Sequence, residues 1–304
     1  MNKSIKGSLM LMLTALIWGT TFVAQSIGMD HIDPFTFNFS RTMIGAIILI
    51  PIIAAFRTFD SKSKGKTSLK NTITGGILCG IILFIASSFQ QSGISLTTAG
   101  KAGFITALYI VIVPVFEFIL YKKTSPKIWC CAIIAVIGFY LLCIKEGSNV
   151  GKGDLLVLVC AVFFAGHIMV IDFFGRKNTD GMLMSCIQFF TAAVLLFICM
   201  LLYESPDIKS IAAAWRPILY AGILSCGVAY TLQIIGQKYT PPAAATLIMS
   251  LESVFAALAG WLILKESLSL KELIGCSLVF SAVILSQSPN TAKENKRNIE
   301  RNVP

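Results

Sequence analysis

Apolar runs of about 20 residues recur along nearly the whole chain, and this pattern limits the fold more than any other feature of the sequence. Each run is long enough to cross a hydrocarbon layer of about 30 Å as an α-helix. The chain has 304 residues, of which 56% are hydrophobic and only 13% charged, whereas an ordinary globular protein carries roughly a quarter charged residues. A soluble core cannot absorb that much apolar surface. We therefore expect an all-α membrane protein.

The apolar runs predict ten transmembrane helices and leave no stretch long enough for a soluble domain. The first run is too long for a cleaved signal peptide and lacks a small-x-small cleavage site, so we interpret it as the first helix. The predicted helices cover residues 5–28, 34–56, 70–94, 97–121, 127–145, 153–175, 182–203, 214–237, 242–264 and 270–287.

The loops between the helices predict the orientation. With the N-terminus inside, the cytoplasmic side carries about 17 Lys and Arg residues and the outer side about seven, as the positive-inside rule requires. An even number of helices then places both termini in the cytoplasm, including a polar tail at residues 289–304. The net charge of +10 lies in these short loops and therefore does not indicate a nucleic-acid partner. We expect a multi-pass protein of the cell (inner) membrane.

The two halves of the chain resemble each other. The segment at residues 88–97 aligns with the segment at 231–240 at an offset of 143 positions, and the same register pairs Tyr109 with Glu252. We expect a first repeat at residues 1–147 and a second at 148–288. Because each repeat holds five helices, the second must enter the membrane from the opposite face. Such inverted repeats are typical of transporters, which bind substrate near the midplane where the repeats meet. Within these two ten-residue segments the identical pairs are Gln90 and Gln233, Gly93 and Gly236, and Thr97 and Thr240.

Glu252 is the strongest candidate for a functional residue. It is predicted near the middle of a membrane helix, where an ionisable side chain is costly and its presence indicates a function. Its partner in the repeat register, Tyr109, is predicted at the same depth. Glu252 could carry a proton or contact a substrate amine. Alternatively, it is a buried carboxylate that neighbouring hydroxyls satisfy.

Arg41 is the second charged candidate, about two turns inside the helix predicted at 34–56. A guanidinium can hold a substrate carboxylate through two parallel hydrogen bonds. Arg41 could also pair with Glu252, or extend outward toward Asp30 or Asp33.

Several uncharged polar residues are predicted at similar depth. Gln90 and Gln233 could line a polar cavity, or could join helices by hydrogen bonds. Trp18 and Thr21 lie in the middle of the first helix and could line the same cavity, although a lone Trp in a membrane helix is often a packing residue. We include all four as candidates.

One helix of the second half carries both a histidine and an acidic residue. His167 is the deeper of the two, and we expect it to be a polar residue of the cavity. Asp172 stands one turn before Arg176, a spacing that predicts an ordinary ion pair near the cytoplasmic surface.

Three segments resemble a known transporter family. Residues 16–23 (LIWGTTFV) and 39–46 (FSRTMIGA) resemble the first EamA repeat, and residues 251–266 (LESVFAALAGWLILKE) resemble the end of the second one. On these segments the chain is similar to members of the drug/metabolite transporter superfamily, EamA type. The resemblance implies a ten-helix fold of inverted repeats around a central cavity, usually exporting amino acids, other metabolites or drugs. The first half departs from this pattern, with Lys122 and Lys123 where the second has Lys265 and Glu266.

We therefore expect a secondary transporter that exports a small metabolite, amino acid or drug by alternating access. The chain lacks the Gly-x4-Gly-Lys-Ser/Thr loop that binds nucleotide phosphates, so a proton or substrate gradient would supply the energy. The expected partners are a small-molecule substrate, membrane lipid and protons, with the chain acting as a monomer or homodimer. We expect no cofactor, no metal site, no nucleic acid and no catalytic residue.

A flippase for a lipid or a lipid-linked sugar is the alternative function. A membrane-embedded enzyme is disfavoured, because the only histidines are His31 and His167, and neither His-Glu-x-x-His nor Gly-x-Ser-x-Gly occurs.

Overall fold

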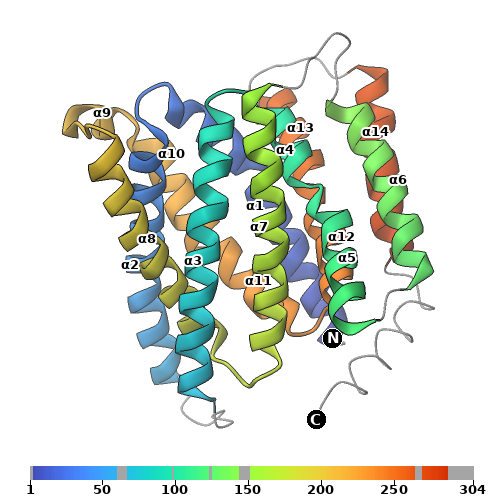
Figure 1. Ribbon diagram of the computed structural model, residues 1–304, viewed down its shortest axis with the longest axis horizontal. Coiled ribbons are helices and arrows are strands. Elements are labelled where there is room, and N and C mark those ends of the chain that lie inside the picture. The colour runs from blue at the N-terminus through green and yellow to red at the C-terminus, as the bar shows by residue number, and fades with distance from the viewer. Residues whose placement is uncertain are drawn as a thin grey trace.

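The computed structural model of the chain describes residues 3–59, 67–97, 99–122, 125–143, 151–263 and 269–286. These residues form one bundle of helices joined by short loops (Figure 1). The predicted tail at 289–304, the boundary between the predicted repeats and the pair Lys265 and Glu266 lie outside the described residues. The first half contains α1 (Lys3–Met29), α2 (Pro34–Phe59), α3 (Leu69–Ile94), α4 (Ala99–Thr106), α5 (Tyr109–Tyr121) and α6 (Pro126–Cys143).

The second half follows the same order with more interruptions. It contains α7 (Lys152–Gly175), α8 (Gly181–Tyr203), the short α9 (Ile208–Ala213), α10 (Trp215–Tyr220), the π-helix η1 (Ala221–Ala229), α11 (Tyr230–Gln237), α12 (Pro242–Met249), α13 (Leu251–Ile263) and α14 (Leu270–Ser286).

The helices are long and apolar enough to make this a membrane protein. Eight stretches of the described residues could cross a hydrocarbon layer by length and composition, and a shorter apolar helix covers Pro126–Leu141. Large apolar side chains such as Phe118, Leu202 and Ile284 face outward and are more than half exposed, as expected where lipid rather than water surrounds the bundle. The topology of ten spans stays a prediction. The eight stretches are Ile5–Met29, Pro34–Ala55, Leu69–Ile94, Lys101–Tyr121, Lys152–Gly175, Gly181–Tyr203, Trp215–Gln237 and Pro242–Ala259.

The two halves interleave instead of forming separate domains. In the first half, α3 packs along α7 and α8 of the second half (Figure 1). The segments that correspond to α3 in the second half, η1 and α11, pack along α1 and α2. The outer pair α6 and α14 also joins the halves. The core is therefore shared, and neither half buries its apolar surface alone.

Glycines allow the closest of these contacts, and they do so in corresponding places. A Cβ on Gly7 of α1 would lie 3.0 Å from the carbonyl oxygen of Gly236 on α11, and a Cβ on Gly236 would lie 3.2 Å from that of Gly7. Gly153 of α7 and Gly93 of α3 approach each other in the same way, at 2.9 Å in both directions. The repeat register pairs Gly93 with Gly236, so the two contacts correspond to each other.

The helix predicted at residues 97–121 is interrupted. It divides into α4 and α5, and at the division Leu108 N donates to Ile105 O (3.1 Å), a bond across three residues instead of four. Pro114 lies within α5, one to two turns beyond the break. A proline lacks the N–H of the regular helix ladder and commonly accompanies such irregularities.

The corresponding helix of the second half, predicted at residues 242–264, is interrupted at Ser250 between α12 and α13. The Ser250 hydroxyl donates to Leu247 O at 2.8 Å, and a side chain that bonds back to its own helix bends the backbone. The prediction of two continuous helices was therefore wrong, and the two breaks fall at corresponding positions.

The helix predicted at 214–237 also differs from expectation, because its middle is the π-helix η1. Single π turns are uncommon and occur frequently at functional sites. Gly222 and Gly227 lie within η1, and a Cβ on Gly222 would lie 2.8 Å from the side chain of Ile44 on α2. The wider π turn thus lies where η1 and α2 are in close contact.

Candidate functional site

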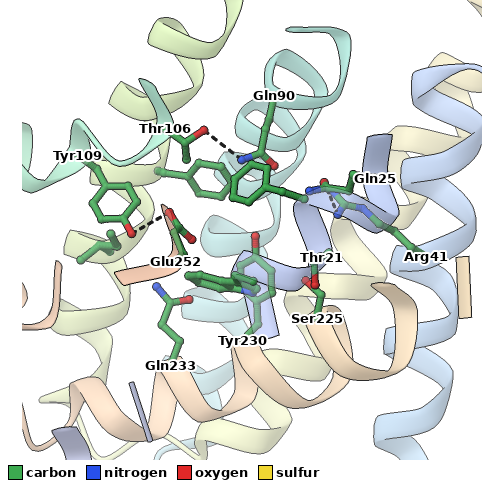
Figure 2. A pocket seen from close by; sticks show the side chains of 14 residues that line it. Thr21, Gln25, Arg41, Gln90, Thr106, Tyr109, Ser225, Tyr230, Gln233 and Glu252 are labelled. Carbon is green, nitrogen blue, oxygen red and sulfur yellow. Dashed lines mark hydrogen bonds between the residues drawn. The ribbon is translucent and has the colours of Figure 1, made fainter. Parts of the chain in front are cut away.

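A cavity lies at the centre of the bundle, where helices from both halves meet (Figure 2). Polar and aromatic side chains from α1, α2, α3, α4, α5, α7, η1, α11 and α13 line it, so it belongs to neither half alone. The lining residues are Trp18, Thr21, Phe22, Gln25, Arg41, Gln90, Thr106, Tyr109, Phe164, Ile168, Ser225, Tyr230, Gln233 and Glu252.

One face of α1 forms a wall of this cavity. Trp18, Thr21, Phe22 and Gln25 follow one another at helical spacing, so their side chains leave α1 on the same side. The Trp18 ring packs against the ring of Tyr230, with centroids 4.7 Å apart and planes inclined by 59°. The Trp18 indole N–H is buried and has no hydrogen-bond partner among the described residues, so it remains available to a ligand.

Glu252 and Tyr109 meet inside the cavity. The Tyr109 hydroxyl donates to Glu252 Oε1 at 3.0 Å, and both side chains are almost fully buried, with 2% and 3% exposure. Each residue lies just beyond the break in its helix, Tyr109 as the first residue of α5 and Glu252 as the second of α13. Figure 2 shows the pair at one side of the cavity.

Close packing of α1 against α13 positions Glu252. At Gly19 on α1, a Cβ would lie only 2.6 Å from Glu252 O and 2.6 Å from Phe255 Cβ. Only glycine allows the two backbones to come this close. Gly19 lies directly after Trp18, so the same turn of α1 supplies the aromatic wall and the contact with α13.

Arg41 lies at the opposite side of the cavity from Glu252 (Figure 2). Its Nη1 donates to Gln25 Oε1 at 2.6 Å and its Nε to Asn38 Oδ1 at 2.9 Å. The side chain is 6% exposed, and its guanidinium lies 5.6 Å from the centroid of the Phe37 ring. All of these contacts are with uncharged groups.

Two of the three interpretations of Arg41 are not observed. Among the described residues, no carboxylate lies within 4.0 Å of its guanidinium. The guanidinium therefore neither pairs with Glu252 nor extends to Asp30 or Asp33. A cation in an apolar interior without a counter-charge is costly. The arrangement leaves room for the remaining interpretation, in which the counter-charge is a ligand.

Gln90 and Gln233 lie in the cavity with different surroundings. The Gln90 amide donates to the Thr106 hydroxyl at 3.3 Å. Gln233 is 1% exposed, and its amide oxygen has no hydrogen-bond partner within the part of the chain that the structure describes. Buried polar atoms normally find a partner. This oxygen therefore offers an acceptor to a polar ligand.

His167 is the one predicted candidate outside the cavity lining. It is fully buried on α7, and one ring nitrogen lies 3.0 Å from Gln188 Oε1. Its ring meets the ring of Tyr230 edge-on, with centroids 6.0 Å apart. Since Tyr230 lines the cavity, His167 lies behind that wall.

Two ion pairs lie away from the cavity. Asp172 and Arg176 form the predicted bridge within α7, at 2.8 Å. Asp154 at the start of the same helix receives Lys101 Nζ at 2.6 Å, the Thr97 hydroxyl at 2.8 Å and Gly151 N at 2.8 Å. This second cluster fastens α4 to α7.

Sequence reasoning missed several lining residues that carry polar groups. Gln25 could have been found, because it lies two turns after Trp18 on the face that also carries Thr21. Tyr230 similarly precedes Gln233 by one turn. No sequence signal pointed to Thr106 or Ser225, whose positions depend on the helix break and on the π-helix.

The lining residues do not suggest a metal centre. Within the described ranges, no group of three or more His, Cys, Asp or Glu residues could hold a metal ion. The described cysteines are unpaired and, where buried, pack among apolar side chains, as small apolar residues do.

Comparisons with known proteins agree with this architecture. The sequence pattern of the EamA-like transporter family matches the chain twice, at residues 5–144 and 151–287. A protein of Archaeoglobus fulgidus named "Uncharacterized transporter" is 32% identical over 284 residues, which cover 93% of this chain and 86% of that protein. "Uncharacterized transporter YoaV" of Bacillus subtilis is 25% identical over 292 residues, covering 93% of this chain and 97% of its own.

A solved crystal structure also resembles the fold. It is 20% identical in sequence and superposes with a TM-score of 0.75, covering 92% of this chain and 96% of that chain. At this level of identity the likeness concerns the fold alone.

Proposed function

The chain belongs to the EamA-like transporter family, and from this premise we propose that it is a secondary transporter that exports a small polar organic molecule by alternating access through the central cavity. The observation that carries the proposal is the cavity itself. It contains a buried guanidinium, a buried carboxylate and unpartnered polar atoms, and helices of both halves line it. A binding site between two repeats is the arrangement that alternating access uses.

The proposed topology has ten spans, of which α6 and α14 are the two shorter ones. Both termini lie in the cytoplasm, and the protein lies in the cell (inner) membrane. In this topology α4 with α5, and α12 with α13, each form one broken span. The two halves are then inverted repeats. Broken helices at corresponding positions support this, because transporters commonly place discontinuous helices at the substrate site.

We further propose that transport is coupled to protons through Glu252. A buried carboxylate in the path of a solute can exchange its proton as the cavity faces one side and then the other. Tyr109, Tyr230 and Arg41 are the other titratable or charged groups of the cavity. We propose that the chain works as a monomer or a homodimer.

Transport into proteoliposomes tests this function. Purified protein is reconstituted, and a panel of amino acids, nucleobases and cationic dyes is offered with and without a proton gradient. We expect at least one small polar solute to accumulate when the gradient is present. Glu252→Gln should abolish gradient-driven accumulation, whereas Glu272→Gln, at the start of α14 and outside the cavity lining, should retain it. Failure to move any solute, with scrambling of a fluorescent phospholipid instead, would favour the flippase alternative.

A further inference from the structure

The guanidinium of Arg41 has more hydrogen-bonding capacity than its protein surroundings use. Arginine carries five N–H donors in a planar fork. Two are used, one toward Gln25 and one toward Asn38. Nη2 has no partner among the described residues, and the side chain borders the cavity. The unused edge of the fork is therefore available to an acceptor that enters the cavity.

The charge of Arg41 is also unmatched. Its protein partners are two neutral amides and the face of Phe37, and the carboxylate within the same cavity, Glu252, is bound by Tyr109 instead. A buried cation that contacts only neutral groups destabilises the protein. A carboxylate is the partner whose two oxygens match two N–H groups of the guanidinium. A positively charged solute at this position would meet like charge.

The rest of the cavity suits a molecule that extends away from such a carboxylate. The aromatic ring of Tyr230 lies between Arg41 and Glu252 (Figure 2), and the Trp18 ring packs against it, with centroids 4.7 Å apart. The unpartnered indole N–H of Trp18 and amide oxygen of Gln233 belong to the same lining, and Gln233 lies on the Glu252 side of the cavity (Figure 2). One end of the site thus offers a cation, the middle offers apolar faces, and the far end offers polar atoms.

We propose that Arg41 binds the carboxylate of the transported molecule, so that the substrates of this protein are small organic carboxylates and not organic cations. The carboxylate takes the open edge of the guanidinium and replaces Gln25 Oε1 at Nη1. This inference rests on the proposed function, since it names the substrate class of the same cavity.

Equilibrium binding to the purified full-length protein tests the proposal without requiring transport. Small carboxylic acids are compared with their primary amides, which keep the size and lose the charge, with matched organic amines, and with inorganic phosphate. We expect the wild type to bind one or more acids at least about tenfold more tightly than the corresponding amides, the difference of one charge-assisted hydrogen bond. Preference for the amides or amines, binding of phosphate alone, or no binding of any acid would overturn the proposal.

Variants locate the site. Arg41→Lys keeps the charge and removes the fork, so acid binding should weaken about tenfold or more, while Arg41→Gln should abolish the preference for acid over amide. Arg216→Gln is the matched control, because Arg216 lies over the Trp215 ring at 5.3 Å outside the cavity. Equal acid binding by Arg41→Lys and Arg216→Gln would overturn the assignment. If Arg41→Gln does not fold, the comparison of acid with amide binding by the wild type still tests the proposal.

The two proposals can fail separately. Acids that bind through Arg41 but do not cross the membrane of proteoliposomes would contradict the proposed function and leave the carboxylate site intact. Transport of organic cations at the same rate in wild type and Arg41→Lys would support the function and overturn the substrate class.

Discussion

The hydroxyl of Tyr109 lies 3.0 Å from Glu252 Oε1, and these two residues occupy the same position in the two halves, 143 residues apart. Atoms related by a twofold axis lie at equal distances on opposite sides of it. In the proposed arrangement of inverted repeats, corresponding side chains that touch must therefore lie next to the axis. Each residue also follows a break in its helix, so the hydrogen bond joins the two broken helices at the centre of the cavity.

The first prediction concerns this bond. Glu252→Gln keeps the size of the side chain and an acceptor for Tyr109, and it removes the charge. We expect transport to fall at least about tenfold and to become independent of the proton gradient. Tyr109→Phe should slow transport without abolishing its dependence on the gradient, because the carboxylate remains. Rates in proteoliposomes across a pH series measure both effects.

A double variant tests whether the two residues act as one unit. If they do, the combined loss should be smaller than the product of the single losses. Glu272→Gln serves as the control for removing a carboxylate that does not line the cavity. Full gradient-driven transport by Glu252→Gln would remove Glu252 from the mechanism.

The second prediction concerns the contact of α1 with α13. Gly19→Ala places a Cβ 2.6 Å from Glu252 O and 2.8 Å from Ala256 N, and backbone atoms cannot move aside as a flexible side chain can. We expect destabilisation of about 1–3 kcal/mol, as for other overpacked positions, together with lost transport as α13 shifts. Thermal unfolding in detergent measures the first effect and proteoliposome transport the second.

Gly166→Ala is the matched control for this prediction. Gly166 lies in α7, and nothing lies within 4 Å of a Cβ there. Alanine is a better helix former than glycine, so the variant should be at least as stable as the wild type. Equal melting temperatures for Gly19→Ala and Gly166→Ala would contradict the role of the α1–α13 contact.

The third prediction concerns the Asp154 cluster. Lys101 Nζ lies 2.6 Å from Asp154 Oδ2, and this ion pair fastens α4 to α7. The repeat register pairs Lys101 with Ala244, which cannot form an ion pair. In the proposed orientation this ion pair closes the outer side only. Asp154→Asn should therefore favour the outward-open state. A cysteine at Thr106, in a background without the native cysteines, should react faster with an impermeant maleimide added outside.

The control for the Asp154 variant is Asp207→Asn. Asp207 is exposed and caps the short helix α9, where it receives Ser210 N at 3.1 Å, so it holds no two long helices together. Its substitution should leave the labelling rate unchanged. An unchanged rate in Asp154→Asn as well would show that the ion pair does not hold the outer side closed.

Much of this architecture could be predicted from local features of the sequence. Long apolar runs predict membrane helices because only apolar side chains are favourable against lipid. The helix predicted at residues 34–56, for example, begins at the first residue of α2. The repeat register related Tyr109 to Glu252 without any knowledge of the fold. The direct contact between the two could not be read from the register, because it depends on how closely the halves pack around the axis.

Other features depend on packing that no local pattern reveals. The π-helix η1 and the break at Ser250 have the composition of ordinary helices. The structure shows η1 in close contact with α2 and the Ser250 hydroxyl bonded back to Leu247 O, and neither contact can be read from composition. The neutral surroundings of Arg41 depend on Gln25 and on Asn38, which lie on two different helices. Composition could predict that Arg41 needs a partner, and only the tertiary structure shows which groups surround it.

The last prediction concerns a carboxylate that joins two helices of opposite halves. Glu204 ends α8, and its side chain receives Phe35 N, Thr36 N and the Thr36 hydroxyl, each at 2.7 Å. These N–H groups belong to the first turn of α2, where they have no partner in the helix ladder, and a negative charge there also interacts favourably with the helix dipole.

Glu204→Ala should destabilise the protein by about 1–2 kcal/mol, and Glu204→Gln by less, because the amide keeps one acceptor. Asp207→Ala, which removes the cap of the exposed α9, should cost less than Glu204→Ala. Thermal unfolding in detergent ranks the three, and a melting temperature of Glu204→Ala equal to that of Asp207→Ala would contradict the role of Glu204 in holding α8 to α2.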